Sequence, residues 1–231
     1  MKSITEIQQE YGPKLAKAAL DLGAIKLRPE APFTWASGYR MPIYNDNRQF
    51  LAVPGYRALI RDAFAGMVEA LGLQDVDNIA GTATAGIPHA VTLADKLGKP
   101  MSYVRSSAKD HGMGKQIEGL TSGGYEGKKV LLIEDLISTG SSSIKALEAI
   151  RAAQGDCGVC LAIFTYGLDK AAEAFAALDP VCSVYTILDY DTMVRTALAE
   201  GYIGDADAES LRQWREAPFV WGEAHGFPKE G

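Results

Sequence analysis

The stretch from Val130 to Ser143, VLLIEDLISTGSSS, indicates both a fold class and the place of a site. Its apolar part, 130–133, is typical of a strand that is buried on both faces of a parallel sheet. Two acids, Glu134 and Asp135, follow at the carboxyl end of that strand, where open α/β sheets bind their ligands. The small polar residues 138–142 then open a helix, so that hydroxyls, free backbone N–H groups and the helix dipole converge. We interpret this turn as a phosphate cradle.

The acids and the turn together fit one ligand, a ribose 5-phosphate. The carboxylates can accept hydrogen bonds from the two ring hydroxyls while the turn holds the 5-phosphate. The alternative is a capped helix after a strand with an exposed acid pair, but capping alone does not require two acids and four hydroxyls at this spacing. Other phosphate motifs fit less well, because the chain has no G-x-x-x-x-G-K-[ST] and GMGKQI at 112–117 lacks the third glycine of a dinucleotide fingerprint.

Helical and apolar segments alternate outward from this stretch, beginning at Pro54. The apolar runs expected as further strands are 76–80, 102–105, 159–166 and 181–188. The segments expected as helices are 56–71, 88–97, 140–154 and 170–179. This alternation predicts an α/β fold with a doubly wound, mainly parallel sheet.

The two ends of the chain differ from this α/β core. Ser3 and Glu6 have the spacing of a capping box, which predicts an opening helix, and 24–44 holds short apolar pieces separated by Pro and Gly. We therefore expect three regions. They are a helix and cap, or hood, at 1–50, the α/β core at 51–205 with a flexible loop at 106–125, and a C-terminal helix and tail at 206–231. The final segment, WGEAHGFPKEG, is expected to be loose.

Charge and composition exclude some classes of partner. The 231 residues include 23 Lys and Arg against 29 Asp and Glu, a net charge of −6. Such a chain does not coat nucleic acid or an anionic membrane through bulk charge, so we expect neither partner. No apolar run approaches the roughly 18 residues of a membrane span, and no apolar stretch follows Lys2 as in a secretory signal. The odd, sparse set of three cysteines fits a reducing compartment, and we expect the cytoplasm.

Two patterns that suggest metal binding have simpler interpretations. Cys157 and Cys160 form C-x-x-C at the start of an apolar strand, with no second pair, so alternating core and surface positions are expected rather than zinc. His89 and His225 lack acid or cysteine partners at ligand spacing and are expected to be structural. We expect no metal held directly by protein side chains.

Segment 130–142 resembles the phosphoribosyl pyrophosphate motif of type I phosphoribosyltransferases. Three further segments are similar to orotate phosphoribosyltransferases within that family: FTWASGYRMPIYNDNR (33–48), IAGTATAGIPHA (79–90) and YVRSSAKDHGMGKQIEG (103–119). The resemblance implies a type I phosphoribosyltransferase fold with a hood. It also implies transfer of ribose 5-phosphate from phosphoribosyl pyrophosphate to orotate, giving orotidine 5-phosphate and pyrophosphate in pyrimidine synthesis.

The residues themselves leave other functions open. The strand, acids and turn are shared with phosphoribosyltransferases for a purine or for uracil. A non-catalytic regulator that senses a nucleotide could keep the same fold, although such a protein usually adds a DNA-binding domain, for which this acidic chain has no spare length. The similarity of the hood segment, 33–48, to orotate phosphoribosyltransferases favours orotate over these alternatives.

The segment 103–119 has the composition of a basic lid. Its cations alternate with glycines that make the backbone flexible, and it follows a strand of the same sheet as the phosphate cradle. The resemblance implies that Arg105, Lys109 and His111 grip the pyrophosphate. It also implies that the loop closes over the site of a neighbouring subunit, and hence a homodimer with shared active sites.

The resemblance also assigns the substrate-binding residues. Those expected to hold the sugar and its 5-phosphate are Glu134, Asp135, Leu136, Ile137, Ser138, Thr139, Gly140, Ser141 and Ser142. In the hood, Arg40 is expected to contact the carboxylate or carbonyls of orotate, and Tyr44 to offer a stacking face. Mg²⁺ is expected as the cofactor, held mainly by substrate and water.

Two features of the sequence concern the pyrophosphate and the base. The turn GTATAGI, 81–87, suits a backbone contact with pyrophosphate, while glycine for tight strand–helix packing is the alternative. One branch of the family carries lysines where this chain has Ala36, Ala85 and Ser106. The orotate-binding arginine that this branch places after its fifth strand has no clear match near 166–170.

Overall fold

The structure, a computed structural model, describes residues 1–35, 37–106, 116–121 and 123–230. Lys109 and His111 therefore lie outside the described residues. The central sheet contains β5 (Asn78–Thr82), β6 (Met101–Val104), β7 (Ile117–Glu118), β8 (Lys129–Ile137), β9 (Asp156–Thr165) and β10 (Ser183–Asp189). Their order is β10-β9-β8-β5-β6-β7, and all neighbours are parallel except β6 and β7. The prediction of a mainly parallel sheet is confirmed.

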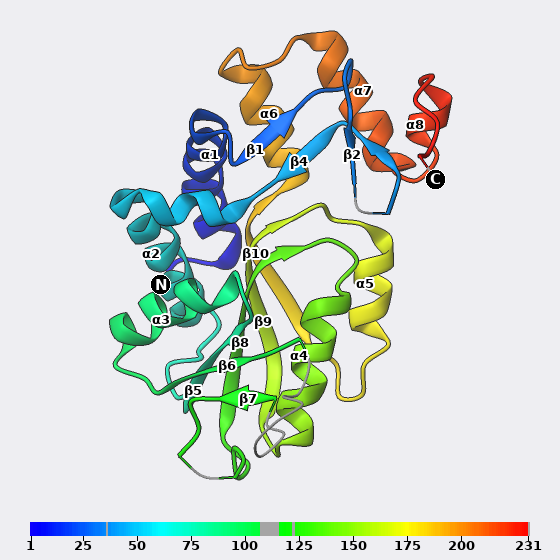
Figure 1. Ribbon diagram of the computed structural model, residues 1–231. Coiled ribbons are helices and arrows are strands. Elements are labelled where there is room, and N and C mark those ends of the chain that lie inside the picture. The colour runs from blue at the N-terminus through cyan, green and yellow to red at the C-terminus, as the bar shows by residue number, and fades with distance from the viewer. Residues whose placement is uncertain (36, 107–115, 122, 231) are drawn as a thin grey trace.

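Helices cover both faces of this sheet, so the fold is doubly wound (Figure 1). On one face lie α1 (Ile4–Leu22), α2 (Pro54–Ala70) and α3 (Gly86–Leu97), and on the other lie α4 (Ser141–Ala152) and α5 (Asp169–Ala176). Strand β8 contributes to both cores: Leu131 and Ile133 pack with α1–α3, while Val130 and Leu132 pack with α4 and α5. This division explains why 130–133 is apolar without alternation.

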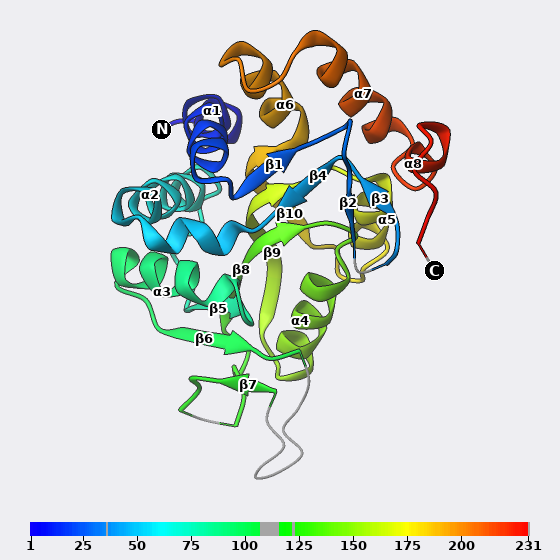
Figure 2. The same ribbon diagram turned by 45° about the horizontal axis from the view of Figure 1, so that its top comes forward.

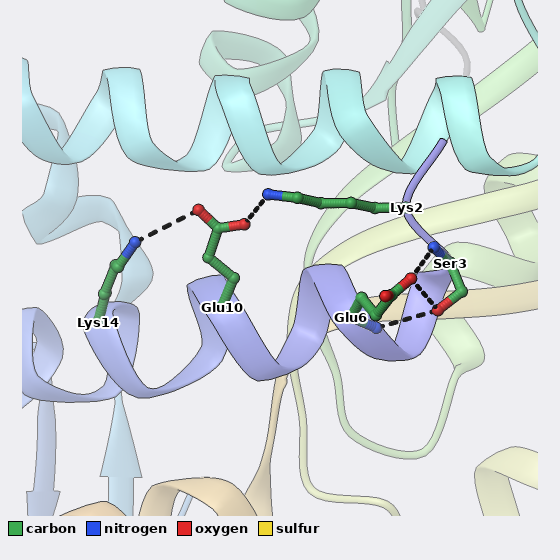
Figure 3. A network of polar contacts seen from close by, with 5 residues as sticks. All are labelled: Lys2, Ser3, Glu6, Glu10 and Lys14. Carbon is green, nitrogen blue, oxygen red and sulfur yellow. Dashed lines mark hydrogen bonds and ion pairs between the residues drawn. The ribbon is translucent and has the colours of Figure 1, made fainter.

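The first helix begins as the capping box predicts (Figure 3). The Ser3 N–H donates to Glu6 Oε2 at 2.7 Å, and the Glu6 N–H donates back to Ser3 Oγ at 3.2 Å. Glu10 pairs with Lys2 and with Lys14 on the exposed side of the same helix. The box satisfies N–H groups of the first turn that have no partner within the helix.

The hood consists of two small antiparallel sheets and a 3₁₀ helix. Its elements are β1 (Ile25–Leu27), β2 (Phe33–Thr34), β3 (Arg40–Met41), β4 (Ile43–Asn45) and η1 (Asn47–Ala52). Figures 1 and 2 place these strands beyond one end of the central sheet, between α1 and the C-terminal helices. The Asn47 side-chain amide donates to the backbone carbonyl of Asp135 at 2.7 Å, which joins the hood to the carboxyl end of β8.

The loop expected at 106–125 contains regular structure. Ile117 and Glu118 form β7 and pair with Val104 and Tyr103 of β6. Tyr125 is buried, and its hydroxyl lies 2.8 Å from Ser102 Oγ. Residues 107–115 within this segment lie outside the described part. The strand pairing of Ile117 and the burial of Tyr125 limit any irregular loop to a shorter segment than the sequence predicts.

The C-terminal segment is packed, and the prediction of a loose tail is wrong. After β10 the chain forms α6 (Tyr190–Ala199), α7 (Asp205–Glu216) and α8 (Trp221–Ala224). Trp221 is 2% exposed, and its ring stacks on His225 with centroids 4.6 Å apart. The Glu230 N–H donates to the Gly38 carbonyl at 2.9 Å, so the tail reaches back to the hood. Burial of the apolar Trp221 side chain holds the tail against the rest of the protein. The polar composition of the segment did not indicate this packing.

Cys157 and Cys160 are both buried in the core under α4, not divided between core and surface. The pairing of β8 with β9 is irregular at this point, which places both side chains on one face of the strand. Within the described ranges, no three His, Cys, Asp or Glu side chains are grouped to hold a metal. In the same ranges, no helix combines the length and apolar character needed to cross a membrane.

Candidate active site

A cavity of about 520 Å³ lies where β5, β6 and β8 end. Its lining includes eight of the residues predicted from the sequence: Arg105, Asp135, Leu136, Ser138, Thr139, Gly140, Ser141 and Ser142. Three segments far apart in the chain therefore meet there, because parallel strands bring their carboxyl ends to one edge of the sheet. Ile137 is an exception: its side chain is buried in the core, and its carbonyl accepts from the Tyr166 N–H at 3.2 Å.

The turn before α4 has the geometry of an anion site. Gly140 has φ 81°, in the left-handed region, and no side chain caps the helix that begins at Ser141. A Cβ at Gly140 would lie 2.9 Å from Phe175 Cε2. Because the first turn of a helix leaves N–H groups without intrahelical partners, these groups and the serine hydroxyls are available to a phosphate.

The two acids of the motif lie in different surroundings. Asp135 lines the cavity, whereas Glu134 is 3% exposed and does not line it. The Glu134 carboxylate accepts the Asp135 N–H and the Ser143 hydroxyl, each at 2.9 Å. Burial, with the neighbouring charge of Asp135, raises the pKa of Glu134, and burial also raises the pKa of Asp135. Of the two acids expected to hold the sugar, only Asp135 lines the cavity.

Several residues that line the cavity were not predicted as site residues, among them Lys145 and Thr82, although Thr82 lies within the turn at 81–87. Thr82 Oγ1 is buried and has no hydrogen-bond partner among the described residues, although it lines the cavity. A buried hydroxyl of this kind is costly unless a ligand or water satisfies it. Lys145 lies one helical turn beyond Ser141, and this i, i+4 spacing was the signal available in the sequence.

The turn at 81–87 serves packing and also reaches the cavity. A Cβ at Gly86 would lie 2.5 Å from the Ile133 carbonyl oxygen, so α3 packs directly on β8 there. Thr82 and Ala83 of the same turn line the cavity. The contact at Gly86 supports the interpretation that glycine allows tight packing here. The position of Thr82 and Ala83 is compatible with a contact between this turn and pyrophosphate.

Arg105 is held at the edge of the cavity by the strand pair below it. Its backbone N–H donates to the Gln116 carbonyl at 2.9 Å, and its Nη1 lies 3.8 Å from Glu118 Oε1. Gln116 Nε2 in turn donates to the Arg105 carbonyl at 3.0 Å. The segment between them includes the predicted Lys109 and His111, which lie outside the described residues.

A second cavity of about 820 Å³ adjoins the first, and the two share Leu136, Ser138 and Thr139. Its aromatic residues are Trp35, Tyr39, Tyr44, Tyr166 and Phe219. Its polar residues include Thr34, Ser37, Asn45 and Lys170. Flat aromatic surfaces beside a sugar-phosphate site suit a planar base.

Arg40, which the sequence analysis assigned to the base, does not line this cavity. Its Nη1 lies 2.6 Å from Glu230 Oε1 of the tail, and its Nη2 donates to the Pro32 carbonyl at 3.1 Å. The prediction for Arg40 missed this arrangement because it treated the tail as loose. Tyr44, which was expected to offer a stacking face, lines the cavity, and its ring lies 5.6 Å from that of Phe33.

Comparison with known proteins agrees with this geometry. The phosphoribosyl transferase domain family matches residues 46–192. The orotate phosphoribosyltransferase of Bacillus caldolyticus is 49% identical over 208 residues, 90% of this chain and 98% of its own. That of Staphylococcus saprophyticus is 48% identical over 202 residues, 87% of this chain and 97% of its own. The chain belongs to the orotate phosphoribosyltransferase family. A crystal structure of this family, from Aeropyrum pernix, superposes with a TM-score of 0.68 at 29% identity, covering 82% of this chain and 99% of that one.

The residues that line the first cavity can be compared with the oxygen ligands that Mg²⁺ prefers. Asp135 is the only carboxylate among the described residues that line the sugar-phosphate cavity. One carboxylate beside a phosphate site fits Mg²⁺ that is coordinated mostly by substrate oxygens and water. A cage built from protein ligands alone has no counterpart in the described part of the chain.

Proposed function

We propose that this protein transfers the ribose 5-phosphate group from phosphoribosyl pyrophosphate to orotate, releasing pyrophosphate and orotidine 5-phosphate. The observation that carries this proposal is the pair of adjoining cavities. One has the hydroxyl-rich turn and Asp135, the other has aromatic walls, and Leu136, Ser138 and Thr139 belong to both. A sugar phosphate in the first cavity would present its C1 toward a base in the second. The 49% identity to an orotate phosphoribosyltransferase supports orotate as that base.

The chemistry requires charge stabilisation and positioning more than proton transfer. Breaking the bond between C1 and pyrophosphate develops positive charge on the ribose ring and negative charge on the leaving group. Asp135 orients the ribose through its hydroxyls, and the turn at 138–142 anchors the 5-phosphate. Arg105, at the edge of the cavity, stabilises the leaving pyrophosphate. Holding both substrates in line accounts for much of the expected acceleration.

We propose Mg²⁺ as the cofactor. When bound, it would neutralise charge on the pyrophosphate, and Asp135 is the protein carboxylate available near it. Removal of Mg²⁺ by a chelator should abolish turnover and leave the melting temperature of the free protein unchanged. A fall in that melting temperature on chelation would indicate a structural metal instead.

The lid, the dimer and the cellular setting are further parts of the proposal. The resemblance of 103–119 supports Lys109 and His111 as pyrophosphate ligands that a neighbouring subunit supplies, and hence a homodimer. Closure of that segment would exclude water, which otherwise hydrolyses the activated sugar. We place the reaction in the cytoplasm, in pyrimidine nucleotide synthesis, without a nucleic-acid or membrane partner.

Lys109→Ala tests the lid. The variant should lose about a hundredfold in kcat, because one charge-stabilising group is removed from the transition state, while its melting temperature stays unchanged. Lys14→Ala, at an exposed position on α1, is the control and should keep full turnover. If sites are shared, mixing Lys109→Ala with Asp135→Asn should restore part of the activity. Unchanged turnover in Lys109→Ala would remove the lid from the mechanism.

The reaction itself is tested by the absorbance of orotate after mixing with phosphoribosyl pyrophosphate and Mg²⁺. The proposal predicts a loss of orotate absorbance with one pyrophosphate released per orotate consumed. Turnover with a purine or with uracil, but not with orotate, would assign the protein to another base. Binding of nucleotides without turnover of any base would indicate a regulator on the same fold.

A further inference from the structure

Asp135, the acid proposed to hold the ribose, lies where β8 loses one of its two neighbouring strands. β5 ends at Thr82 and pairs with β8 only as far as Ile133. On the other side of β8, the register with β9 continues to Ile137. Asp135 is therefore beyond the end of the β5 ladder. Backbone polar groups that are shielded from water at such a place need partners other than a strand.

Two side chains provide these partners. The Asp135 N–H donates to Glu134 Oε1 at 2.9 Å, and the Asp135 carbonyl accepts from Asn47 Nδ2 at 2.7 Å. The first bond is local to β8, whereas the second comes from the hood, 88 residues earlier in the chain. A separation of 2.7 Å is at the short end of the range for N–H···O hydrogen bonds. Asn47 therefore joins the hood directly to the backbone of the acid that lines the sugar-phosphate cavity.

The position of Asn47 is itself fixed by its surroundings. Asn47 is 1% exposed and begins η1. Before it, the Asp46 N–H donates to the Ala24 carbonyl at 2.7 Å, and after it, Phe50 is buried in the same core as Leu131 and Ile133 of β8. A side chain can orient another group only when packing holds it in one place. These contacts give Asn47 such a place.

We infer that Asn47 is a positioning residue for the sugar: by holding the Asp135 carbonyl, it sets where the Asp135 carboxylate meets the ribose hydroxyls. This inference rests on the proposed function. Asn47 lines neither the sugar-phosphate cavity nor the aromatic cavity, so it acts on the substrate through Asp135. A displacement of about 1 Å in a group that positions a substrate can cost on the order of a hundredfold in rate. The hydrogen bond from the hood prevents such a displacement at the end of β8.

The test is a double-mutant cycle on the affinity for phosphoribosyl pyrophosphate, measured by calorimetry with Mg²⁺ and without orotate. The four proteins are the wild type, Asn47→Leu, Asp135→Ala and the double variant. Asn47→Leu should weaken phosphoribosyl pyrophosphate by about tenfold, because the carboxylate that binds the ribose is no longer held in place. In the Asp135→Ala background the same substitution should change the affinity by less than about twofold, since the carboxylate through which Asn47 acts is absent.

Leucine has nearly the shape of asparagine, and it also removes Asn47 Oδ1, which is buried without a hydrogen-bond partner among the described residues. Gln49→Leu is the matched control, because Gln49 belongs to the same η1 and its Nε2 donates to the Gly23 carbonyl at 3.4 Å rather than to β8. It should keep the wild-type affinity. In steady-state kinetics, Asn47→Leu should raise the KM for phosphoribosyl pyrophosphate and leave the KM for orotate unchanged. A general loss of hood structure would raise both.

The outcomes separate this inference from the proposed function. Wild-type affinity in Asn47→Leu, or equal losses with and without the Asp135 carboxylate, would contradict the role of Asn47 and leave the proposed function intact. A wild-type protein that neither binds phosphoribosyl pyrophosphate nor consumes orotate would overturn the proposed function, and the inference with it. Asn47→Ser, whose shorter side chain does not reach the Asp135 carbonyl, takes the place of Asn47→Leu in the cycle if the leucine variant does not fold.

Discussion

Glu134 and Asp135 are consecutive residues of β8, so their side chains point to opposite faces of the strand. Asp135 faces the cavity, while Glu134 is buried and accepts a hydrogen bond from the Ser143 hydroxyl at the start of α4. The sequence motif shows an acid pair, but the period of the strand gives its two members different roles. Glu134 holds the start of α4 through Ser143, and Asp135 is the acid that would contact the sugar in the proposed function.

The burial of Glu134 predicts a pH dependence of stability. Burial and the charge of Asp135 raise the pKa of Glu134 from 4.5 to about 8. Below pH 4.5, the Glu134 carboxyl group is protonated in both the folded and the unfolded states. As the pH rises through this window, only the unfolded chain releases it, so the free energy of unfolding falls.

Glu134→Gln should remove this loss of folding free energy at higher pH. The variant should gain stability over the wild type as the pH is raised from 4.5 toward 8, as measured by thermal unfolding across that window. Glu148→Gln, on the exposed side of α4, should follow the wild-type profile. An unchanged profile in Glu134→Gln would contradict the neutral, buried state assigned to this acid.

At the scale of one element, the turn before α4 depends on Gly140. Its left-handed φ of 81° is strained for a residue with a Cβ, and the ring of Phe175 occupies the space that a Cβ would need. Gly140, Ser141 and Ser142, at the start of α4, line the cavity, and no side chain caps this helix. If the turn binds phosphate as proposed, stability and phosphate binding are coupled at Gly140.

Gly140→Ala should lower the free energy of unfolding by more than the about 1–2 kcal/mol of left-handed strain, and should raise the KM for phosphoribosyl pyrophosphate. Gly127 offers a matched control, because it has φ 82° and a Cβ added there would meet nothing within 4 Å. Gly127→Ala should show the strain in urea unfolding and leave that KM unchanged. Equal effects of the two substitutions on both quantities would contradict the account of the turn.

At the scale of the whole molecule, the hood and the C-terminal segment meet at the aromatic cavity. The C-terminal segment contributes Phe219 to the cavity, and the Phe219 ring packs against Tyr39 of the hood at 5.3 Å. Two residues farther along, Trp221 is buried and donates its indole N–H to the Ser210 carbonyl at 3.0 Å. The tail therefore forms part of the wall of the aromatic cavity where the base is proposed to bind.

Trp221→Ala should destabilise the protein by about 3–5 kcal/mol, the usual cost of truncating a buried aromatic side chain. Because Phe219 is anchored through this region, the KM for orotate should rise more than the KM for phosphoribosyl pyrophosphate. Val220→Ala is the control, since that side chain is 58% exposed. A destabilised Trp221→Ala protein in which the two KM values rise equally would show that the tail does not shape the base site.

Features that depend on local pattern could be predicted from the sequence, whereas contacts between distant segments could not. The continuous apolar run at 130–133 predicts a strand between two helical layers, and the small polar residues after it predict the anion turn, because both depend on local pattern. The position of Arg40 could not be predicted in this way, since its partner Glu230 is 190 residues away. Likewise, β7 forms because Ile117 pairs with Val104, and Lys170 of α5 lines the same cavity as Tyr44 of the hood only once the chain has folded.

A crystal structure of the protein with phosphoribosyl pyrophosphate tests whether Asp135 and the turn at 138–142 hold one sugar phosphate. We expect the 5-phosphate on the N–H groups and hydroxyls of 138–142, the ribose hydroxyls on Asp135, and the carboxyl group of Glu134 still hydrogen-bonded to Ser143. A sugar phosphate bound in another place, or ribose hydroxyls held by Glu134 with Asp135 turned away, would contradict it.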